Sequence, residues 1–287
     1  MEKPLKKPAW IKVKLNTNEN FAQLKKLVRE QQLNTVCVEA ACPNIYECWS
    51  AGTATFMILG DTCTRSCGFC NVKTGSSDWV DPDEPRRVAE SILKMKVKYA
   101  VITSVNRDEL YHGGAEIFAE TVKEIRRLSP HCQLELLIPD FKGCEESLNI
   151  VSESKPEVIA HNIETVKRLT PDVRPQANYE RSLEVIKNIG RLGIVSKSAV
   201  MGGLGETFEE IVSTMEDLRA VDCKVFNVGQ YLQPSTKHLP VKRWVHPDEF
   251  KEIEKIGKTL GFSHVESGPL VRSSYHAEKI SGILADS

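Results

Sequence analysis

Six short apolar segments, each followed by a segment with helical periodicity, constrain the fold of this chain more than any other feature. The apolar segments are rich in β-branched residues and have the length of buried strands. Repeated strand–helix units favour a parallel sheet with right-handed connections. The predicted strands are 56–61, 99–105, 133–139, 157–163, 193–202 and 224–232. The predicted helices are 86–96, 115–128, 145–154, 179–192, 207–221 and 247–261.

Two architectures fit this pattern. Strands surrounded by helices are compatible with a partial (β/α) barrel and with an open doubly wound sheet, and periodicity does not distinguish them.

The ends of two predicted helices are marked by specific residues. Thr207 and Glu210 form a capping-box pair, and Pro247 and Gly261 flank the last predicted helix. In a parallel barrel the active site is expected at the C-terminal ends of the strands.

The charge balance argues against a protein that binds nucleic acid through a basic face, since the formal net charge is −1. No apolar run approaches the length of about 18 residues that a membrane-spanning helix needs. The first fifteen residues are basic, but prolines interrupt them and no apolar stretch follows, so they do not resemble a secretion signal. We therefore expect a cytoplasmic protein that binds neither nucleic acid nor membranes.

The cysteines indicate a metal site. Six of the nine lie within residues 37–70, and in a reducing compartment such clustering favours metal binding over disulfides. Cys63, Cys67 and Cys70 form a CxxxCxxC motif directly after the first predicted strand. Three thiolates can ligate three irons of a cubane cluster and leave the fourth iron open for a reaction. A structural zinc loop and ordinary buried cysteines are the alternatives.

A second triplet, Cys37, Cys42 and Cys48, lies upstream. Its gaps of five and six residues do not align on one helix face, and Pro43 interrupts the segment, so a loop wrapped around a metal is predicted. A second cluster with three cysteine ligands is the sharper hypothesis, and three unrelated thiols are the alternative. The remaining cysteines, Cys132, Cys144 and Cys223, are predicted to be buried free thiols.

The CxxxCxxC motif with Phe69 before its last cysteine resembles the signature of the radical S-adenosylmethionine (SAM) superfamily. The two triplets together with the RSSYHA sequence at 272–277 resemble the lipoyl synthase family. ACPNIYECW (41–49), TSVNRDEL (103–110), the GGA at 113–115 and GQYLQPS (229–235) agree with it. Biotin synthase has the first motif but neither the upstream triplet nor RSSYHA.

The resemblance implies a fold and a reaction. The fold is a partial (β/α)6 barrel at 56–262, preceded by an extension at 1–55 that carries the auxiliary-cluster cysteines and followed by an extension at 263–287. The methionyl group of SAM binds the open iron, and its reductive cleavage gives a 5′-deoxyadenosyl radical. Two sulfur atoms are then inserted at C6 and C8 of an octanoyl chain on a lysine of a carrier domain. The auxiliary [4Fe–4S] cluster is the sulfur source.

The resemblance also implies the site residues. Cys63, Cys67 and Cys70 ligate the radical SAM [4Fe–4S] cluster. The auxiliary cluster is ligated by Cys37, Cys42 and Cys48 and by a serine of RSSY, assigned to Ser274 with Ser273 as the alternative. A serine oxygen is a harder ligand than thiolate and should be the weakest of the four.

Two glycine-containing segments are candidates for contact with SAM. Gly113 and Gly114 follow the second predicted strand, where related enzymes receive the methionyl amino group. Because Ala115 and not an acid follows them, contact would be through backbone carbonyls. A helix-entry turn is the alternative. The MGGLGET segment at 201–207 is expected to close on the adenosyl half.

Partners and competing functions follow from the same resemblance. The implied partners are octanoylated carrier domains, namely 2-oxoacid dehydrogenase E2 subunits and the glycine cleavage H protein, and a reducing electron carrier such as flavodoxin or ferredoxin. Another radical SAM enzyme that inserts sulfur or methylthio groups is the nearest alternative. A ferredoxin-like electron carrier and a zinc-stabilised scaffold are alternatives from other classes.

Overall fold

The computed structural model describes residues 5–13, 15, 17–31, 33–40, 42–50, 53–77 and 79–280. The chain divides into two compact units. The N-terminal unit comprises Val13–Arg65 and Asn71–Ile159, and the C-terminal unit comprises Met1–Lys12, Ser66–Cys70 and Ala160–Ser287. The main passage from the first unit to the second falls within β7 (Val158–Ala160).

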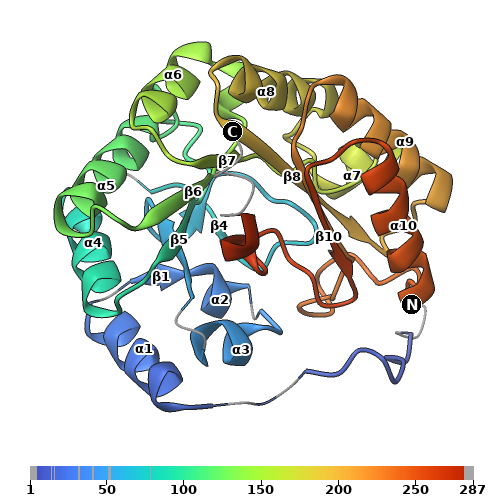
Figure 1. The fold of residues 1–287 in the computed structure, drawn as a ribbon, viewed down its shortest axis with the longest axis horizontal. Helices are drawn as coiled ribbons and strands as arrows, with labels where there is room; N and C mark the ends of the chain where they lie inside the picture. The colour runs from blue at the N-terminus through green and yellow to red at the C-terminus, as the bar shows by residue number, and fades with distance from the viewer. Residues whose placement is uncertain are drawn as a thin grey trace. The chain divides into compact units, whose positions relative to one another are not determined.

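The N-terminal unit contains parallel strands β2 (Thr55–Ile58), β5 (Tyr99–Ser104) and β6 (Gln133–Leu137), which are neighbours in that order. Strand β1 (Asn34–Thr35) pairs antiparallel with β2. Strands β3 (Thr62–Cys63) and β4 (Lys73–Thr74) pair separately. The helices are α1 (Glu19–Glu30), α2 (Val36–Glu39), α3 (Ile45–Ser50), α4 (Glu84–Lys94), α5 (Ala115–Leu128) and α6 (Glu145–Glu153), with a 3-10 turn η1 at Phe141–Gly143. Figure 1 shows α4 and α5 side by side, next to β5 and β6.

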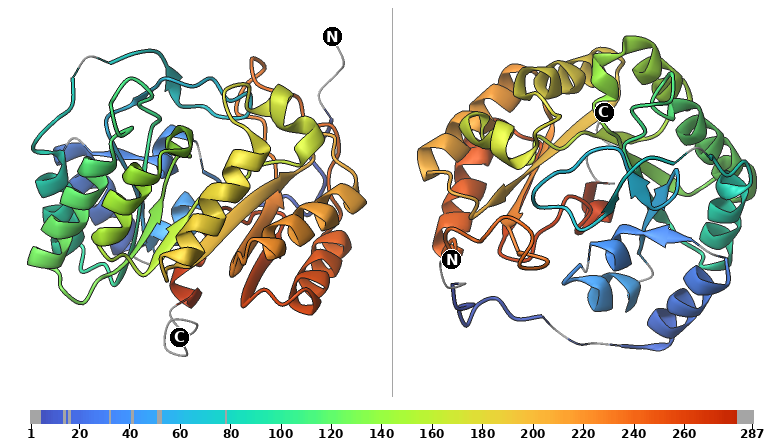
Figure 2. Two further views of the ribbon diagram at one scale, coloured as in Figure 1. Left: turned by 90° about the horizontal axis from the view of Figure 1, so that it is seen from above. Right: turned by 180° about the vertical axis from the view of Figure 1, so that it is seen from behind.

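The C-terminal unit contains parallel strands β8 (Val195–Gly202), β9 (Val225–Gln230) and β10 (His264–Gly268), in that order. Its α-helices are α7 (Thr170–Val173), α8 (Tyr179–Arg191), α9 (Phe208–Ala220) and α10 (Pro247–Thr259). Short 3-10 turns are η2 (Lys167–Leu169) and η3 (Ala277–Ile280). Both views in Figure 2 show α8, α9 and α10, coloured from yellow to orange-red, in a row along these strands.

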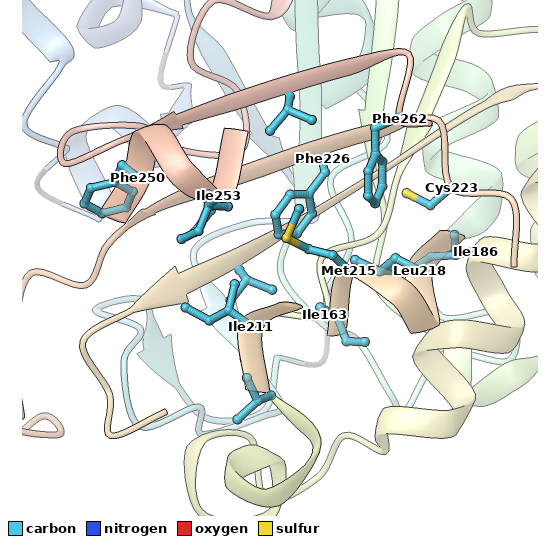
Figure 3. Packing of buried hydrophobic residues seen from close by; sticks show 14 of the residues in the cluster. Ile163, Ile186, Ile211, Met215, Leu218, Cys223, Phe226, Phe250, Ile253 and Phe262 are labelled. Carbon is cyan, nitrogen blue, oxygen red and sulfur yellow. The ribbon is translucent and has the colours of Figure 1, made fainter. Parts of the chain in front are cut away.

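The core of the C-terminal unit fills the space between this sheet and its helices (Figure 3). Phe226 of β9 contributes a fully buried ring, and Met215 and Ile253 come from α9 and α10. Gly257 permits close packing of α10, because a Cβ at this position would lie 2.7 Å from Cγ2 of Val265. Each fully buried large apolar side chain contributes about 1.5–3 kcal/mol to stability through removal from water.

We expect Phe226→Ala to lower the free energy of unfolding by about 3–5 kcal/mol, because truncation removes buried surface and leaves a cavity. Leu192→Ala is the matched control, since its side chain is 41% exposed and its loss should cost less than about 1 kcal/mol. Urea denaturation followed by circular dichroism measures both. Equal losses would contradict the central position of Phe226 in this core.

All six predicted strands and the helices that follow them are confirmed, with ends shifted by a few residues. The capping box of Thr207 and Glu210 is present, and Pro247 stands in the first turn of α10.

The prediction of a non-helical loop for the upstream cysteines is wrong in part. Cys37 lies on α2 and Cys48 on α3. The helices escape a periodicity argument because each is too short to present a face, and Pro43 lies in the break between them.

The remaining cysteines are free thiols as predicted. Cys132 and Cys223 are buried, but Cys144 is only half-buried, so its prediction as a buried residue is wrong. It is the N-cap residue of α6, where the chain is still at the surface. Hydrogen bonds with Ser147 lower the pKa of its thiol.

Among the described helices, none has the length and apolar character to cross a membrane.

Candidate active site

A tight turn after β2 directs the chain toward Cys63. Leu59 and Gly60 have φ angles of 68° and 86°. A positive φ is unfavourable for Leu59, because leucine has a side chain. The buried carboxylate of Glu84, at the start of α4, accepts their N–H groups at 2.6 and 3.3 Å. Burial raises the pKa of this carboxyl, and the two N–H bonds oppose that effect. Glu84 therefore fixes the direction in which the chain leaves β2.

Cys63 lies on β3 and is buried. Its Sγ accepts the backbone N–H of Asn106 at 3.3 Å and that of Arg65 at 3.5 Å. Its carbonyl accepts the N–H of Gly75 at 2.9 Å. Amide donors directed at a sulfur stabilise negative charge on it and tune a bound iron–sulfur cluster. The surroundings of Cys63 therefore suit a metal thiolate.

Arg65, within the CxxxCxxC motif, is buried in an ion-pair network. Its Nε and Nη2 donate to Asp108 at 2.7 and 2.8 Å, and Nη2 also donates to Asp140 at 2.7 Å. Burial alone would lower the pKa of the guanidinium, but the bonds and charges of the two aspartates outweigh it and raise the pKa above its usual range. The network ties the cluster loop to the segments that follow β5 and β6.

Arg107 is a second buried arginine that sequence analysis did not single out. Its side chain donates to the carbonyls of Leu59 at 3.2 Å, Trp79 at 3.3 Å and Ser77 at 2.7 Å, and it pairs with Glu109. It thereby joins the turn after β2 to the segment that precedes α4. The only sequence signal was its place in TSVNRDEL, directly after a buried strand.

The second half of the motif, Ser66–Cys70, is held within the C-terminal unit. Gly68 donates to the carbonyl of Val173 and accepts from the N–H of Leu239, both at 2.9 Å. A Cβ on Gly68 would lie 2.8 Å from Cδ1 of Leu239, so a side chain would force the segments apart. The ring of Phe69 packs against an apolar cluster built on Val173, Leu204 and Tyr231. Phe69 therefore anchors the loop between Cys67 and Cys70.

The upstream cysteines lie in the N-terminal unit. Thr35 caps α2 by accepting the N–H of Val38, and the N–H of Cys42 donates to the carbonyl of Cys37 at 3.1 Å. Burial, and next the neighbouring Cys42, raise the pKa of Cys37 to about 11. Cys48 follows on α3. The structure therefore brings Cys37 and Cys42 together.

The two predicted glycines form the entry to α5. Gly114 is the N-cap residue with a φ of 90°, and Gly113 has a φ of 60°. A Cβ on Gly114 would lie 2.3 Å from Cδ1 of Leu59, so the position requires glycine. The carbonyl of Gly114 accepts the N–H of Ile117 at 3.1 Å. The helix-entry alternative is thus observed, and cofactor contact by these glycines stays a prediction.

The MGGLGE turn after β8 closes on its own glutamate. The buried carboxylate of Glu206 accepts the N–H groups of Gly203, Leu204 and Gly205 at 2.6, 2.8 and 3.1 Å. Arg243 lies 3.2 Å from the same carboxylate. Three N–H groups that converge in this way form an anion-binding nest. Because Glu206 fills it, the turn is rigid, and contact with the adenosyl half of SAM stays a prediction.

A buried polar cluster after β7 was missed by sequence analysis. Arg174 donates to the carbonyls of Asn162 and Ile163 at 3.1 and 3.0 Å, and Asn162 donates to Glu164 at 3.1 Å. Oδ1 of Asn162 and Nε of Arg174 are buried and have no hydrogen-bond partner among the described residues. Buried polar atoms without partners are rare and suggest a ligand. The available signal was polar residues at the end of the predicted strand 157–163 and directly after it, namely Asn162 and Glu164.

The RSSYHA segment follows β10 and ends on Ala277, the first residue of η3. The N–H of Tyr275 donates to the carbonyl of Arg272 at 3.0 Å and closes a turn around Ser273 and Ser274. The ring of Tyr275 stacks on that of His276 with centroids 3.9 Å apart, and His276 lies 3.4 Å from Glu266 of β10. The two serines are thus placed on an ordered turn.

The donor set fits iron–sulfur clusters. None of the six motif cysteines is joined in a disulfide within the described part of the chain. Among the described residues, no three cysteine, histidine or carboxylate side chains are grouped as ligands of one metal ion. A cubane cluster needs a different arrangement, because each thiolate binds its own iron. The chemistry of the thiols therefore suits clusters, and the ligand assignments stay predictions.

Comparisons with known proteins agree on one family. The model of the "Radical SAM superfamily" matches residues 57–218. Mitochondrial lipoyl synthase of Nematostella vectensis is 58% identical over 274 residues, which are 95% of this chain and 94% of that protein. Lipoyl synthase of Flavobacterium psychrophilum is 56% identical over 277 residues, 96% of each chain.

Solved structures support the fold. Methylornithine synthase superposes with a TM-score of 0.51 at 12% identity over 89% of this chain and 80% of that one. Coproporphyrinogen III oxidase of Escherichia coli, a radical SAM enzyme, gives a TM-score of 0.51 at 12% identity over 72% and 51%. These likenesses and the family match confirm the predicted α/β fold of the radical SAM type. The chain therefore belongs to the lipoyl synthase family of the radical SAM superfamily.

Proposed function

We propose that this enzyme inserts sulfur at C6 and C8 of an octanoyl chain that is attached to a lysine of a carrier protein. The observation that carries the proposal is two separate sets of three cysteines, none of them in a described disulfide, in a chain of the lipoyl synthase family. A single set would be enough for cleavage of SAM. A second set provides for an auxiliary cluster, which we propose as the sulfur donor.

The proposed ligands are those that the family resemblance implies. Cys63, Cys67 and Cys70 would hold the radical SAM [4Fe–4S] cluster. The auxiliary [4Fe–4S] cluster would be held by Cys37, Cys42, Cys48 and Ser274, and Ser273 is the alternative to Ser274. Two observations support this assignment: none of the six cysteines is in a described disulfide, and two N–H groups are directed at Sγ of Cys63. When bound, the first cluster and SAM supply the chemistry that removes hydrogen from an unactivated carbon.

The residues of the chain would bind and orient the cluster and SAM. Arg65 and Glu84 hold the backbone on either side of Cys63, and Gly113 and Gly114 are proposed to receive the methionyl amino group through backbone carbonyls. Asn162 and Arg174 offer buried polar atoms for the rest of SAM. Rigid surroundings of this kind keep a reactive radical in contact with its intended partner and away from water.

Asn162→Ala should weaken SAM binding about 10-fold, since a buried amide that bonds a ligand is worth roughly 1–2 kcal/mol. Equilibrium dialysis with the anaerobic holoenzyme measures the dissociation constant. Asn149→Ala, at an exposed position on α6, is the control. An unchanged dissociation constant for Asn162→Ala would remove the cluster after β7 from the cofactor site.

The proposed partners are octanoylated carrier domains of 2-oxoacid dehydrogenase E2 subunits and the glycine cleavage H protein, with flavodoxin or ferredoxin as the electron donor. We propose a cytoplasmic location, although one relative is named as mitochondrial. We also propose the division into an extension at 1–55, a barrel at 56–262 and an extension at 263–287.

The function is tested by the product. The reduced holoenzyme is incubated with SAM and an octanoyl-lysine peptide, and the peptide is analysed by mass spectrometry. We expect two sulfur atoms to be added to each octanoyl group, which becomes a lipoyl group. A methylthio group on the product, or an unmodified peptide with SAM consumed, would contradict the proposal and favour another radical SAM activity.

A further inference from the structure

Asn227 of β9 binds the backbone of the segment that carries the two serines. Its Nδ2 donates to the carbonyl of Arg272 at 3.1 Å and to that of Ser273 at 3.0 Å. Asn227 is 2% exposed, so the donor end of both hydrogen bonds is shielded from water, although Arg272 and Ser273 are themselves half-buried. Buried amide–carbonyl bonds hold their partners more firmly than exposed ones, because water does not compete for them.

The same segment approaches β9 at a second point. A Cβ on Gly229 would lie 1.9 Å from the carbonyl oxygen of Val271, so no other residue allows this approach. The N–H of Gln230 donates to the carbonyl of Pro269 at 3.3 Å. Contacts at Pro269, Val271 and Asn227 therefore fix the path of the chain from β10 to Ser273.

The orientation of the Asn227 amide is determined by its surroundings. Two carbonyl oxygens face one end of it, so that end must be the donor, Nδ2. The other end, Oδ1, is buried and has no hydrogen-bond partner within the described part of the chain. An unpaired buried oxygen is unfavourable. The amide is therefore retained in this position by its two bonds to the serine segment.

We propose that Asn227 is a positioning residue, which holds the turn at 272–275 in the conformation that presents Ser274 to the auxiliary cluster. The inference rests on the proposed function, because it takes Ser274 as a ligand. A serine oxygen is the weakest ligand in the proposed set. Ordering a free backbone costs entropy with each residue that is fixed. A turn already bound to β9 avoids that cost, so a weak ligand can still hold the cluster.

The test compares Asn227→Val with Asn227→Thr. The two side chains have nearly the same shape, but only threonine has a hydroxyl that can donate to one of the two carbonyls. Both are placed in full-length protein in which Cys63, Cys67 and Cys70 are alanine, so that the remaining iron reports the auxiliary cluster alone. Iron release to a chelator is followed anaerobically by the loss of cluster absorbance.

We expect the valine variant to lose iron about 10-fold or more faster than the parent, with threonine between them, since each buried hydrogen bond contributes about a factor of five to ten. Thr214→Val is the control for lost stability, because it removes a buried hydroxyl that donates to Glu210 at 2.9 Å on α9. It should release iron at the parental rate. Ser274→Cys in the valine variant should slow the release, since thiolate binds iron more strongly than serine oxygen.

Each outcome decides the inference. A parent without iron would overturn the proposed ligand set and the inference together. A parent that retains iron, with valine and threonine variants that release it equally fast, would overturn the inference and leave the proposed function intact. Hydrogen exchange at the amide of Tyr275, which closes the turn, should also be faster in the valine variant than in the threonine variant.

Discussion

Cys42→Ala should abolish sulfur insertion while cleavage of SAM remains measurable. The reason is that Cys42 belongs to the upstream triplet, whereas the proposed cluster for SAM cleavage is held by Cys63, Cys67 and Cys70. Loss of one of the few ligands should empty the auxiliary site, since outer-shell changes alone already cost 10–100-fold in metal affinity. Cleavage is measured as 5′-deoxyadenosine by chromatography, and insertion as lipoyl product by mass spectrometry of an octanoyl-lysine peptide.

Two further variants are controls for this result. Cys63→Ala should abolish both activities, because it removes a proposed ligand of the cluster that cleaves SAM. Cys223→Ala, at a buried free thiol outside both cysteine motifs, should leave both activities in place. A Cys42→Ala enzyme that still forms lipoyl product would show that the upstream triplet does not supply the sulfur.

Arg65→Met should lower the free energy of unfolding by about 3–5 kcal/mol, because it leaves the fully buried carboxylate of Asp140 without its cation. Arg65→Lys should recover only part of this loss, since an ammonium group cannot reproduce the forked contact with Asp108. Urea denaturation of the anaerobic holoenzyme measures the unfolding. Iron content measured in parallel should fall in the methionine variant, because Arg65 ties down the loop that carries Cys63.

The double variant Arg65→Met with Asp140→Asn tests whether the loss of stability comes from the ion pair between these two residues. Removal of both buried charges eliminates the uncompensated carboxylate, so the double variant should be more stable than Arg65→Met alone. Losses that simply add would mean that Arg65 and Asp140 are not coupled. The geometry of the network would then have no energetic consequence.

The sequence was sufficient for the regular elements because their signals are local. The strand at 99–105 begins with four consecutive apolar residues, and Thr207 with Glu210 forms the capping box that begins α9. Strand β10 was not predicted, because HVESG has neither alternation nor an apolar run. It is a strand because it pairs with β9, and such pairing depends on residues distant in sequence.

The candidate site was predicted unevenly for the same reason. Cysteine spacing carries the chemistry of a cluster loop, so Cys63, Cys67 and Cys70 were readable from the chain alone. The groups that hold this loop were not, since Arg65 contacts Asp108 and Asp140 across more than forty residues. The carboxylate of Glu206 in the nest of its own turn was also unexpected. A glycine-rich turn suggests an anion, but not that the anion is supplied by the chain.

The central claim is that three thiolates hold one cubane and leave one iron open to SAM. It is tested most directly by Mössbauer spectroscopy of anaerobic, iron-enriched protein before and after addition of SAM. About eight irons per chain are expected from two four-iron clusters, with SAM changing the signal of one iron site, and with that change lost when Cys63, Cys67 and Cys70 are alanine. A spectrum that SAM leaves unaltered in the intact protein would contradict the claim.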